Sequence, residues 1–415
     1  MKIAVVGSGI SGIFASYLLD RRHSVTLYEK RDRLGGHSHT VDVSLEDSSH
    51  PVDTGFIVYN EKNYPIFEQF LKTLDVTTKP TSMGFSFRDQ ASEMEYGGGG
   101  LGDFFVQKSN LLSLSHWKIL LDILRFYFLA PTKTAAEKSD MTLGEFLDRN
   151  NFSESFVSDH LIPMVSAIWS VPLETAREFP FGYVVDFFRN HGLLKLWNRP
   201  QWRTIEGGSR EYIQAFEQEF DGVIKTNQPV EKITRKDDQV MIQAGYDWTQ
   251  YDGVVLASHS DQSLSLLDEP TRREQTILGS IKYEQNDVLL HTDQSLLPRN
   301  KSIWTSWNYH RDETSTNQTT VTYNLSILQD LPFDQPVCVS LNAGDKVNSD
   351  RILNRFSYAH PVYNQSALEA QDRWEEISGQ KNTYYAGAYW GDGFHEDGVE
   401  SAVRTARQLG VEWTP

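Results

Sequence analysis

The sequence has 415 residues, 39% of them hydrophobic and 23% charged, which is typical of a globular protein with room for two domains. Its formal net charge of −17 argues against a nucleic-acid partner, since such a chain repels phosphates. The one cysteine, Cys338, excludes an intrachain disulfide and a cysteine metal cluster. We find no signal peptide and no run of about twenty apolar residues, so we predict a cytoplasmic protein without a membrane span.

The first elements form a βαβ pattern. Residues 3–6 predict a short buried strand, residues 11–22 a helix and residues 24–29 a second strand. Residues 40–43 and 52–59 predict two further strands, joined by a polar turn at 46–50. The next segment, residues 64–74, has the apolar spacing of a helix.

The middle of the chain contains two helical patterns. Residues 111–129 are strongly apolar, which fits a core helix, the wall of an acyl tunnel or a helix on a membrane surface. Residues 142–149 open with Thr142 as a helix cap and Glu145 three residues later, the pattern of a capping box.

The second half alternates between strands and helices. Residues 205–213 form a glycine-containing turn that leads into a predicted helix. Strands are predicted at 223–233, 239–244 and 253–257. Residues 281–345 are largely β in pattern. A last buried strand at 384–388 precedes a helix at 398–408. The strands of the first domain are therefore scattered along the chain, with a second domain inserted between them.

The glycines of the first βαβ unit form a G-x-G-x-x-G loop from Gly7 to Gly12, between a predicted strand and a predicted helix. Gly7 permits a tight turn, Gly9 lets a pyrophosphate approach the backbone, and Gly12 lets helix and strand pack closely. Glu29 ends the next strand, where its carboxylate can accept hydrogen bonds from ribose hydroxyls. These features predict a dinucleotide site, and the acid disfavours NADP.

The residues after Glu29 carry a resemblance to a known family. The run Arg33-Leu34-Gly35-Gly36 resembles the extended N-terminal motif of the flavin-containing amine oxidase and phytoene desaturase superfamily. The resemblance implies FAD, with the glycine pair beside the pyrophosphate and ribityl chain. Cys338 lies in a predicted strand and is more typical of a small buried residue than of a flavin attachment point, so we expect the FAD to be bound noncovalently. The family usually has arginine after the glycines, whereas this chain has His37.

Three later stretches support the same resemblance. Residues 205–209 resemble the family's second glycine pair, and residues 229–233 resemble the strand whose Val230 backbone would face adenine. Residues 385–402 resemble the C-terminal flavin motif, in which a helix N-terminus stabilises negative charge on the flavin. The family often has an acid directly after the Ala-Gly pair, where this chain has Ala388; Asp392 and Asp397 are candidate replacements.

At closer range the chain resembles bacterial FAD-dependent oxidoreductases associated with cyclopropane-synthase-like methyltransferases. The resemblance is carried by residues 35–40, 52–60, 304–309 and 389–398. It implies a methyltransferase partner and a methylated or unsaturated fatty acyl substrate. A peripheral contact with the inner membrane surface is left open.

The candidate site residues follow from these motifs. The candidate cofactor-binding residues are Gly7, Gly9, Ile10, Ser11, Gly12, Glu29, Lys30, Arg33, Gly35, Gly36, His37, Thr54, Gly55, Phe56, Val230, Gly387, Gly391, Phe394, His395, Glu396, Asp397 and Gly398. The candidate catalytic residues are Tyr389 and Trp390, which follow the Gly387 turn, and the proton acceptors His191 and Tyr323. His37, His39 and His395 could ligate a metal, but their loops already have a nucleotide explanation, so we predict no metal.

The sequence therefore predicts an α/β protein, α+β overall, of amine oxidase-like architecture. A discontinuous, Rossmann-like FAD-binding domain comprises residues 1–80, 200–265 and 375–415. A mixed β-sheet and helical substrate domain comprises residues 81–199 and 266–374. The predicted reaction is hydride transfer from an apolar acyl substrate to flavin. The alternatives are an amine oxidase that makes peroxide, a flavin-dependent isomerase and a non-catalytic flavoprotein partner of a lipid methyltransferase.

Overall fold

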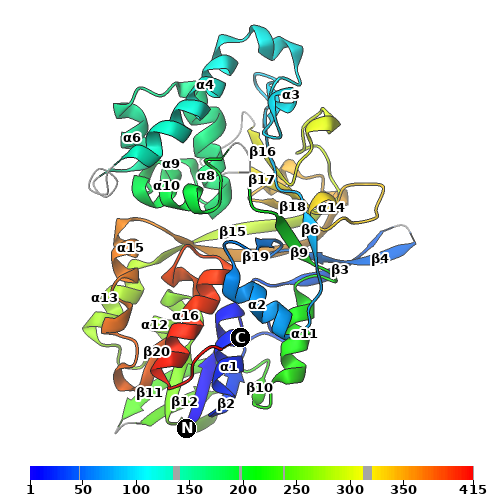
Figure 1. The fold of residues 1–415 in the computed structure, drawn as a ribbon. Coiled ribbons are helices and arrows are strands. Elements are labelled where there is room, and N and C mark those ends of the chain that lie inside the picture. Colours follow the sequence, from blue (N-terminus) through cyan, green and yellow to red (C-terminus); the bar gives the residue numbers. More distant parts are fainter. Residues whose placement is uncertain (46, 134–140, 196–198, 237–238, 312–319, 415) are drawn as a thin grey trace.

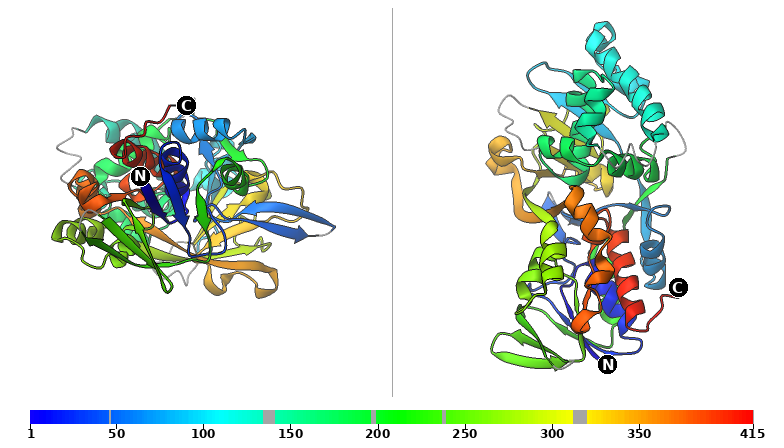
Figure 2. Two further views of the ribbon diagram at one scale, coloured as in Figure 1. Left: turned by 90° about the horizontal axis from the view of Figure 1, so that it is seen from below. Right: turned by 90° about the vertical axis from the view of Figure 1, so that its left-hand side faces the viewer.

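The computed structural model describes the whole chain except residues 46, 134–140, 196–198, 237–238, 312–319 and 415. The molecule is elongated and has two halves (Figures 1 and 2). One half contains the two termini and a parallel sheet. The other contains a large mixed sheet and a cluster of helices.

The parallel sheet has five strands in the order β10-β2-β1-β14-β20. They are β10 (Val223–Lys225), β2 (Ser24–Tyr28), β1 (Lys2–Val6), β14 (Gly253–Leu256) and β20 (Thr383–Tyr385). The strands come from the beginning, middle and end of the chain, as the sequence predicts. The Rossmann-like fold class is thereby confirmed.

Alternate residues of this sheet serve two separate cores. Ile3 and Val5 pack with helices on one face, whereas Ala4 and Val6 pack on the other, because successive strand residues point to opposite faces. The first face is covered by α1 (Ile10–Leu19), α2 (Pro65–Thr73), α11 (Arg210–Glu219) and α16 (His395–Gln408).

The second face carries a smaller sheet and further helices. These are β11 (Val230–Lys236), β12 (Gln239–Ala244), β13 (Asp247–Tyr251), α12 (Ser260–Leu266), α13 (Arg272–Ser280) and α15 (Gln365–Gln371). Helices α13 and α15 pack here, although the predicted boundaries assign residues 266–374 to the substrate domain.

Two predicted strands are wrong in extent. The predicted strand 223–233 is two strands, β10 and β11, because Asn227 between them has a left-handed backbone with φ of 53°. The predicted strand 52–59 is interrupted after β4 (Ser48–Asp53) and resumes only as β5 (Tyr59–Asn60). The residues between them line a cavity described below.

The larger sheet has seven strands in the order β19-β15-β18-β17-β16-β7-β8. They are β19 (Ile352–Val362), β15 (Lys282–His291), β18 (Cys338–Leu341), β17 (Thr320–Asn324), β16 (Trp307–Arg311), β7 (Phe85–Asp89) and β8 (Glu95–Gly97). Strands β15 and β19 pair along their length from Lys282–Val362 to His291–Ile352 and run across the middle of the molecule (Figure 1). The β pattern of residues 281–345 is confirmed outside 312–319, which lie beyond the described residues.

The helical cluster packs a core rich in phenylalanine. Its members are α4 (Leu114–Leu129), α6 (Leu143–Arg149), α7 (Glu154–Phe156), α8 (Ile162–Trp169), α9 (Leu173–Glu178) and α10 (Phe181–Asn190). The short helix α3 (Leu101–Phe104) packs instead against β7, β8 and β16. The Thr142–Glu145 capping box is confirmed, with Glu145 N donating to Thr142 Oγ1 at 3.2 Å. Within the described residues, no helix combines the length and apolar character that crossing a bilayer requires.

Short strands join the two halves. They are β3 (Thr40–Leu45), which pairs with β4, and β6 (Thr78–Thr81) and β9 (Trp202–Ile205), which form a small sheet with β5. The short helix α14 (Leu325–Leu328) follows β17 directly.

Candidate flavin site

A cavity of about 1220 Å³ extends from the loop after β1 to the seven-stranded sheet and the helices α8 and α10. It is larger than the roughly 300–1,000 Å³ of an ordinary ligand pocket. The cavity therefore has room for a dinucleotide cofactor together with part of a substrate.

The G-x-G-x-x-G loop forms one end of this cavity. Gly7 has φ of +102°, which only glycine adopts readily. A Cβ on Gly12 would overlap the Gly7 carbonyl oxygen, whereas a Cβ on Gly9 would meet nothing within 4 Å. Gly9 lines the cavity and Gly12 does not. The loop thus presents bare backbone at Gly9 and the N-terminus of α1 to a ligand, an arrangement that suits a pyrophosphate.

Glu29 lies at the carboxyl end of β2 and also lines the cavity. Its Oε2 accepts hydrogen bonds from Ser8 N at 3.1 Å and Ser8 Oγ at 2.6 Å, and its Oε1 accepts one from Arg31 N at 2.9 Å. The glycine loop therefore fixes this carboxylate beside the position that the motif assigns to the ribose.

The Gly35–Gly36 pair packs against the Gly7–Gly12 loop. Gly36 has φ of +59°, and a Cβ there would lie 3.0 Å from Gly9 Cα. Arg33 does not line the cavity; its guanidinium donates to the carbonyl oxygens of Leu34, Gly36 and Ser38. Arg33 thus supports the turn in which Gly35 and Gly36 face the cavity.

His37 belongs to a group of aromatic side chains contributed by distant segments. Its ring centroid lies 5.8 Å from that of His259, 5.5 Å from His360 and 5.1 Å from Tyr358. Burial lowers the pKa of His37 to about 3, so the imidazole is neutral at pH 7. Its Nε2 is buried and has no hydrogen-bond partner among the described residues. His37 itself lines the cavity, so this neutral ring borders the space that a bound dinucleotide would fill.

The C-terminal segment supplies the opposite wall. Gly387, Phe394 and His395 line the cavity, and His395 stacks on Phe56 with ring centroids 3.5 Å apart. Helix α16 begins at His395, one turn before the predicted start at 398. Its N-terminus therefore lies at the cavity, as the C-terminal motif implies.

Four predicted cofactor residues of this segment lie behind the wall. Glu396 accepts hydrogen bonds from Ile66 N at 2.9 Å and Phe67 N at 3.0 Å, at the start of α2. Asp397 accepts one from Phe394 N at 2.7 Å. Gly398 packs against α1, where a Cβ would lie 2.7 Å from Ile10 Cγ2. Gly391 packs against the side chain of Asp397.

The remaining predicted cofactor residues line the cavity. They are Ile10, Ser11, Lys30, Thr54, Gly55, Phe56 and Val230. Three of the four candidate catalytic residues, Tyr389, His191 and Tyr323, do so as well, whereas Trp390 is buried behind Tyr389.

His160, His191 and Asp392 are among the cavity's titratable groups near the helical cluster. The His191 ring stacks on Phe187 at 3.9 Å, and its Nδ1 lies 3.1 Å from Phe187 O. Burial lowers the pKa of His191 to about 4. Burial raises the pKa of Asp392 to about 6, and it raises the pKa of the neighbouring Asp397 well above its usual range. His191 is therefore neutral at pH 7, and Asp392 is largely ionised.

Sequence reasoning missed His259, Tyr283 and Gln228, which also line the cavity. His259 follows β14, the neighbour of β1, and residues at the carboxyl ends of adjacent parallel strands commonly meet at a ligand. That position was the available signal for His259. No local signal marks Tyr283, which lies at the start of β15.

We predict that His259→Phe makes the protein less sensitive to acid. Burial, together with His360, Lys30 and Arg31, lowers the pKa of His259 to about 4, whereas an unfolded histidine titrates near 6.5. As the pH falls below 6.5, the unfolded chain takes up a proton that the folded chain does not, so the wild type loses stability. Proton uptake by this one histidine in the unfolded chain lowers the free energy of unfolding of the wild type by about 2 kcal/mol between pH 7 and pH 5.

Phenylalanine removes that loss and keeps the ring stack on Tyr283, whose centroid is 4.5 Å away. Urea unfolding of cofactor-free wild type and variant at both pH values measures the difference. Equal losses in the two proteins would contradict the prediction.

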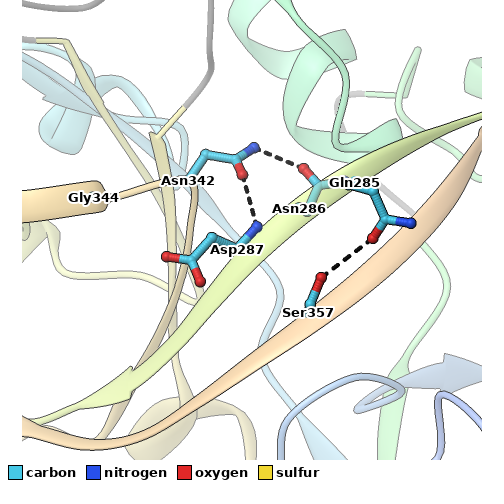
Figure 3. A pocket seen from close by; sticks show the side chains of 6 residues that line it. All are labelled: Gln285, Asn286, Asp287, Asn342, Gly344 and Ser357. Carbon is cyan, nitrogen blue, oxygen red and sulfur yellow. Dashed lines mark hydrogen bonds between the residues drawn. The ribbon is translucent and has the colours of Figure 1, made fainter.

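A second, smaller hollow of about 340 Å³ lies between β15, β18 and β19 (Figure 3). Its polar side chains bind one another: Asn342 Nδ2 donates to Asn286 Oδ1 at 2.7 Å, and Ser357 Oγ donates to Gln285 Oε1 at 3.2 Å. These bonds hold the strands in register, and we assign the hollow no ligand. Among the described residues, no group of three or more metal-ligating side chains is placed to hold an ion.

Comparison with known proteins agrees with this geometry. Residues 10–348 match the family model of flavin containing amine oxidoreductases, so the chain belongs to that family. The chain is accordingly a flavin-dependent oxidoreductase, and the predicted flavin cofactor is confirmed. No curated protein matches the chain significantly.

Several solved structures share the fold. A protein from Exiguobacterium sp. 255-15, provisionally described as a protoporphyrinogen oxidase, aligns with a TM-score of 0.72 at 16% identity over 98% of both chains. A fatty acid isomerase from P. acnes that produces CLA aligns with a TM-score of 0.69 at 16% identity, also over 98% of both chains. Putrescine oxidase bound to putrescine aligns with a TM-score of 0.68 at 14% identity over 99% of both chains.

Proposed function

We propose that this enzyme oxidises an apolar acyl chain, a methylated or unsaturated fatty acyl group, by hydride transfer from carbon to flavin. The apolar wall of the cavity beyond the dinucleotide end carries the proposal. This wall comes from α8 and the seven-stranded sheet: Phe85, Met164, Ile168, Val288, Trp307, Val339 and Leu341. Such a surface favours a hydrocarbon chain through the hydrophobic effect.

The chain's own residues would position the substrate and accept a proton. The flavin, when bound, supplies the electron chemistry. His191 is unprotonated at neutral pH, and in the tautomer whose Nδ1–H donates to Phe187 O its Nε2 can accept a proton. Loss of a hydride and a proton from adjacent carbons would leave a double bond in the acyl chain.

The fold similarity supports this substrate class, because one of the aligned structures is a fatty acid isomerase. A methyltransferase that supplies methylated acyl chains remains the proposed partner, and co-purification from cells would test it.

Amine oxidation is the second candidate. Asp392 lines the cavity together with Trp169, Tyr363 and Phe394. A carboxylate among aromatic rings is a suitable binding place for an ammonium group.

Anaerobic titration of the purified holoenzyme distinguishes these functions. We expect methylated or unsaturated acyl lipids to bleach the visible flavin band, and amines to leave it unchanged. Ile168→Glu should slow this bleaching by about 100-fold, because a charge in an apolar wall opposes the acyl chain. Asp392→Asn, the matched cavity variant, should keep the rate within about threefold of wild type.

Bleaching by amines alone, abolished in Asp392→Asn, would reject the acyl substrate in favour of amine oxidation. Lipid conversion that requires previously reduced flavin and consumes no oxidant would identify an isomerase. Lipid binding without any change of the flavin band would indicate a non-catalytic partner.

A further inference from the structure

Exposed apolar side chains gather at one end of the molecule. Among the described residues, the large exposed hydrophobics in the segment 101–128 form what we name the α4 patch: Leu101, Leu111, Leu112, Leu114, Trp117, Leu121 and Phe128. Leu112 is 90% exposed, Leu114 81% and Phe128 72%. Contiguous apolar surface of this kind usually marks a binding site rather than a free surface.

The patch follows the outer face of α4. Leu114, Trp117, Leu121 and Phe128 recur at helical spacing, and the same helix buries Ile119 and Phe126 on its inner face. Helices α3 and α4 form the end of the molecule farthest from the five-stranded sheet (Figures 1 and 2). The core interpretation of residues 111–129 therefore holds for only one side of this helix.

The charge of this segment is opposite to that of the chain. Residues 101–133 contain four Lys or Arg and two Asp, whereas the whole chain has 39 Lys or Arg and 56 Asp or Glu. Lys108 and Lys118 are exposed, and neither Asp103 nor Asp122 is. Asp122 pairs with Arg125 at 3.6 Å and accepts a hydrogen bond from Ser153 N at 2.8 Å. The exposed surface is thus apolar and basic, which complements an anionic bilayer rather than another copy of this acidic chain.

The same helix reaches the cavity. Tyr127, adjacent to Phe128, lines the cavity together with Leu193 and Arg199. We propose that the α4 patch docks on an anionic phospholipid bilayer, which places this end of the cavity beside the lipid. Docking itself needs no turnover; only its use in delivering an acyl chain rests on the function proposed above.

Co-sedimentation of the holoenzyme with vesicles tests the proposal. Wild type should sediment with vesicles of equal parts phosphatidylglycerol and phosphatidylcholine, and less with phosphatidylcholine alone. The double variant Leu114→Glu/Leu121→Glu should lower partitioning by at least about tenfold. Lys118→Ala should lower it by about fivefold on the anionic vesicles only. Trp248→Glu, at an exposed tryptophan on β13, is the matched control and should bind like wild type.

Flavin content and thermal melting establish that each variant is folded. Wild type that stays in solution with both kinds of vesicle would overturn the proposal, whatever the acyl titration shows. Equal loss of binding in Trp248→Glu would overturn it as well. Self-association that the double variant abolishes, without vesicle binding, would instead assign the patch to a protein interface.

Discussion

Replacing Gly12 with alanine should yield a protein that is less stable by about 3 kcal/mol and binds FAD about 100-fold more weakly. The new Cβ would overlap the Gly7 carbonyl oxygen and lie 3.2 Å from Ala257 Cβ. Both neighbours belong to the strand ends that hold the loop, so the backbone itself must move. Urea unfolding of the cofactor-free protein and FAD titration by fluorescence quenching measure the two effects.

Gly9→Ala separates cofactor contact from folding. A Cβ at Gly9 meets no protein atom within 4 Å and projects where the residue lines the cavity. We therefore expect weaker FAD binding, by about tenfold or more, with unfolding of the empty protein unchanged. Full FAD affinity in Gly9→Ala would show that the pyrophosphate does not approach this backbone.

Asp53→Ala should destabilise the protein by about 3–5 kcal/mol, because it removes a buried, hydrogen-bonded carboxylate. Its oxygens accept hydrogen bonds from Thr40 Oγ1 at 2.6 Å, Ser209 N at 2.9 Å, Ser209 Oγ at 2.7 Å and Gln329 Nε2 at 3.0 Å. Burial raises the pKa of Asp53, and these donors oppose that effect. Alanine would leave several buried donors without a partner, directly before the cavity residues Thr54 and Gly55.

Asp42 provides the matched control on the same hairpin. It pairs with Arg210 at 2.8 Å, but its side chain is 57% exposed. Asp42→Ala should therefore cost less than about 1 kcal/mol. Chemical denaturation of both variants measures the two losses of unfolding free energy. Similar losses would show that the buried hydrogen bonds of Asp53 stabilise the protein no more than the exposed Asp42–Arg210 pair does.

The local parts of the flavin site could be predicted from the sequence because their signals lie within a few residues. The Gly7–Gly12 loop and the Gly35–Gly36 pair contain glycines with positive φ, and Glu29 directly follows β2. The capping box at Thr142 is local in the same way. Such features depend on neighbouring φ and ψ angles and therefore appear directly in the residue pattern.

The cavity wall could not be predicted in this way. Val288, Trp307 and Val339 meet because β15, β16 and β18 belong to one sheet, and strand order is set by long-range pairing. Within a correctly predicted segment, the orientation of individual side chains was also missed. The motif predicted that Glu396 and Asp397 contact the cofactor, yet both carboxylates accept hydrogen bonds from backbone amides behind the wall. A sequence motif identifies a segment without saying which of its side chains turns inward.

The distance in sequence between Gly7 and Gly387 has a consequence for how the enzyme is made. Both line one cavity, and β20 can pair with β14 only once residues 383–385 have been synthesised. At about 5–20 residues per second, synthesis separates the two glycines by roughly 20–80 s. A ribosome-bound chain therefore carries a phosphate-binding loop with no opposite wall. Capture of FAD should therefore wait until the segment around Gly387 has been made and has folded against the Gly7–Gly12 loop.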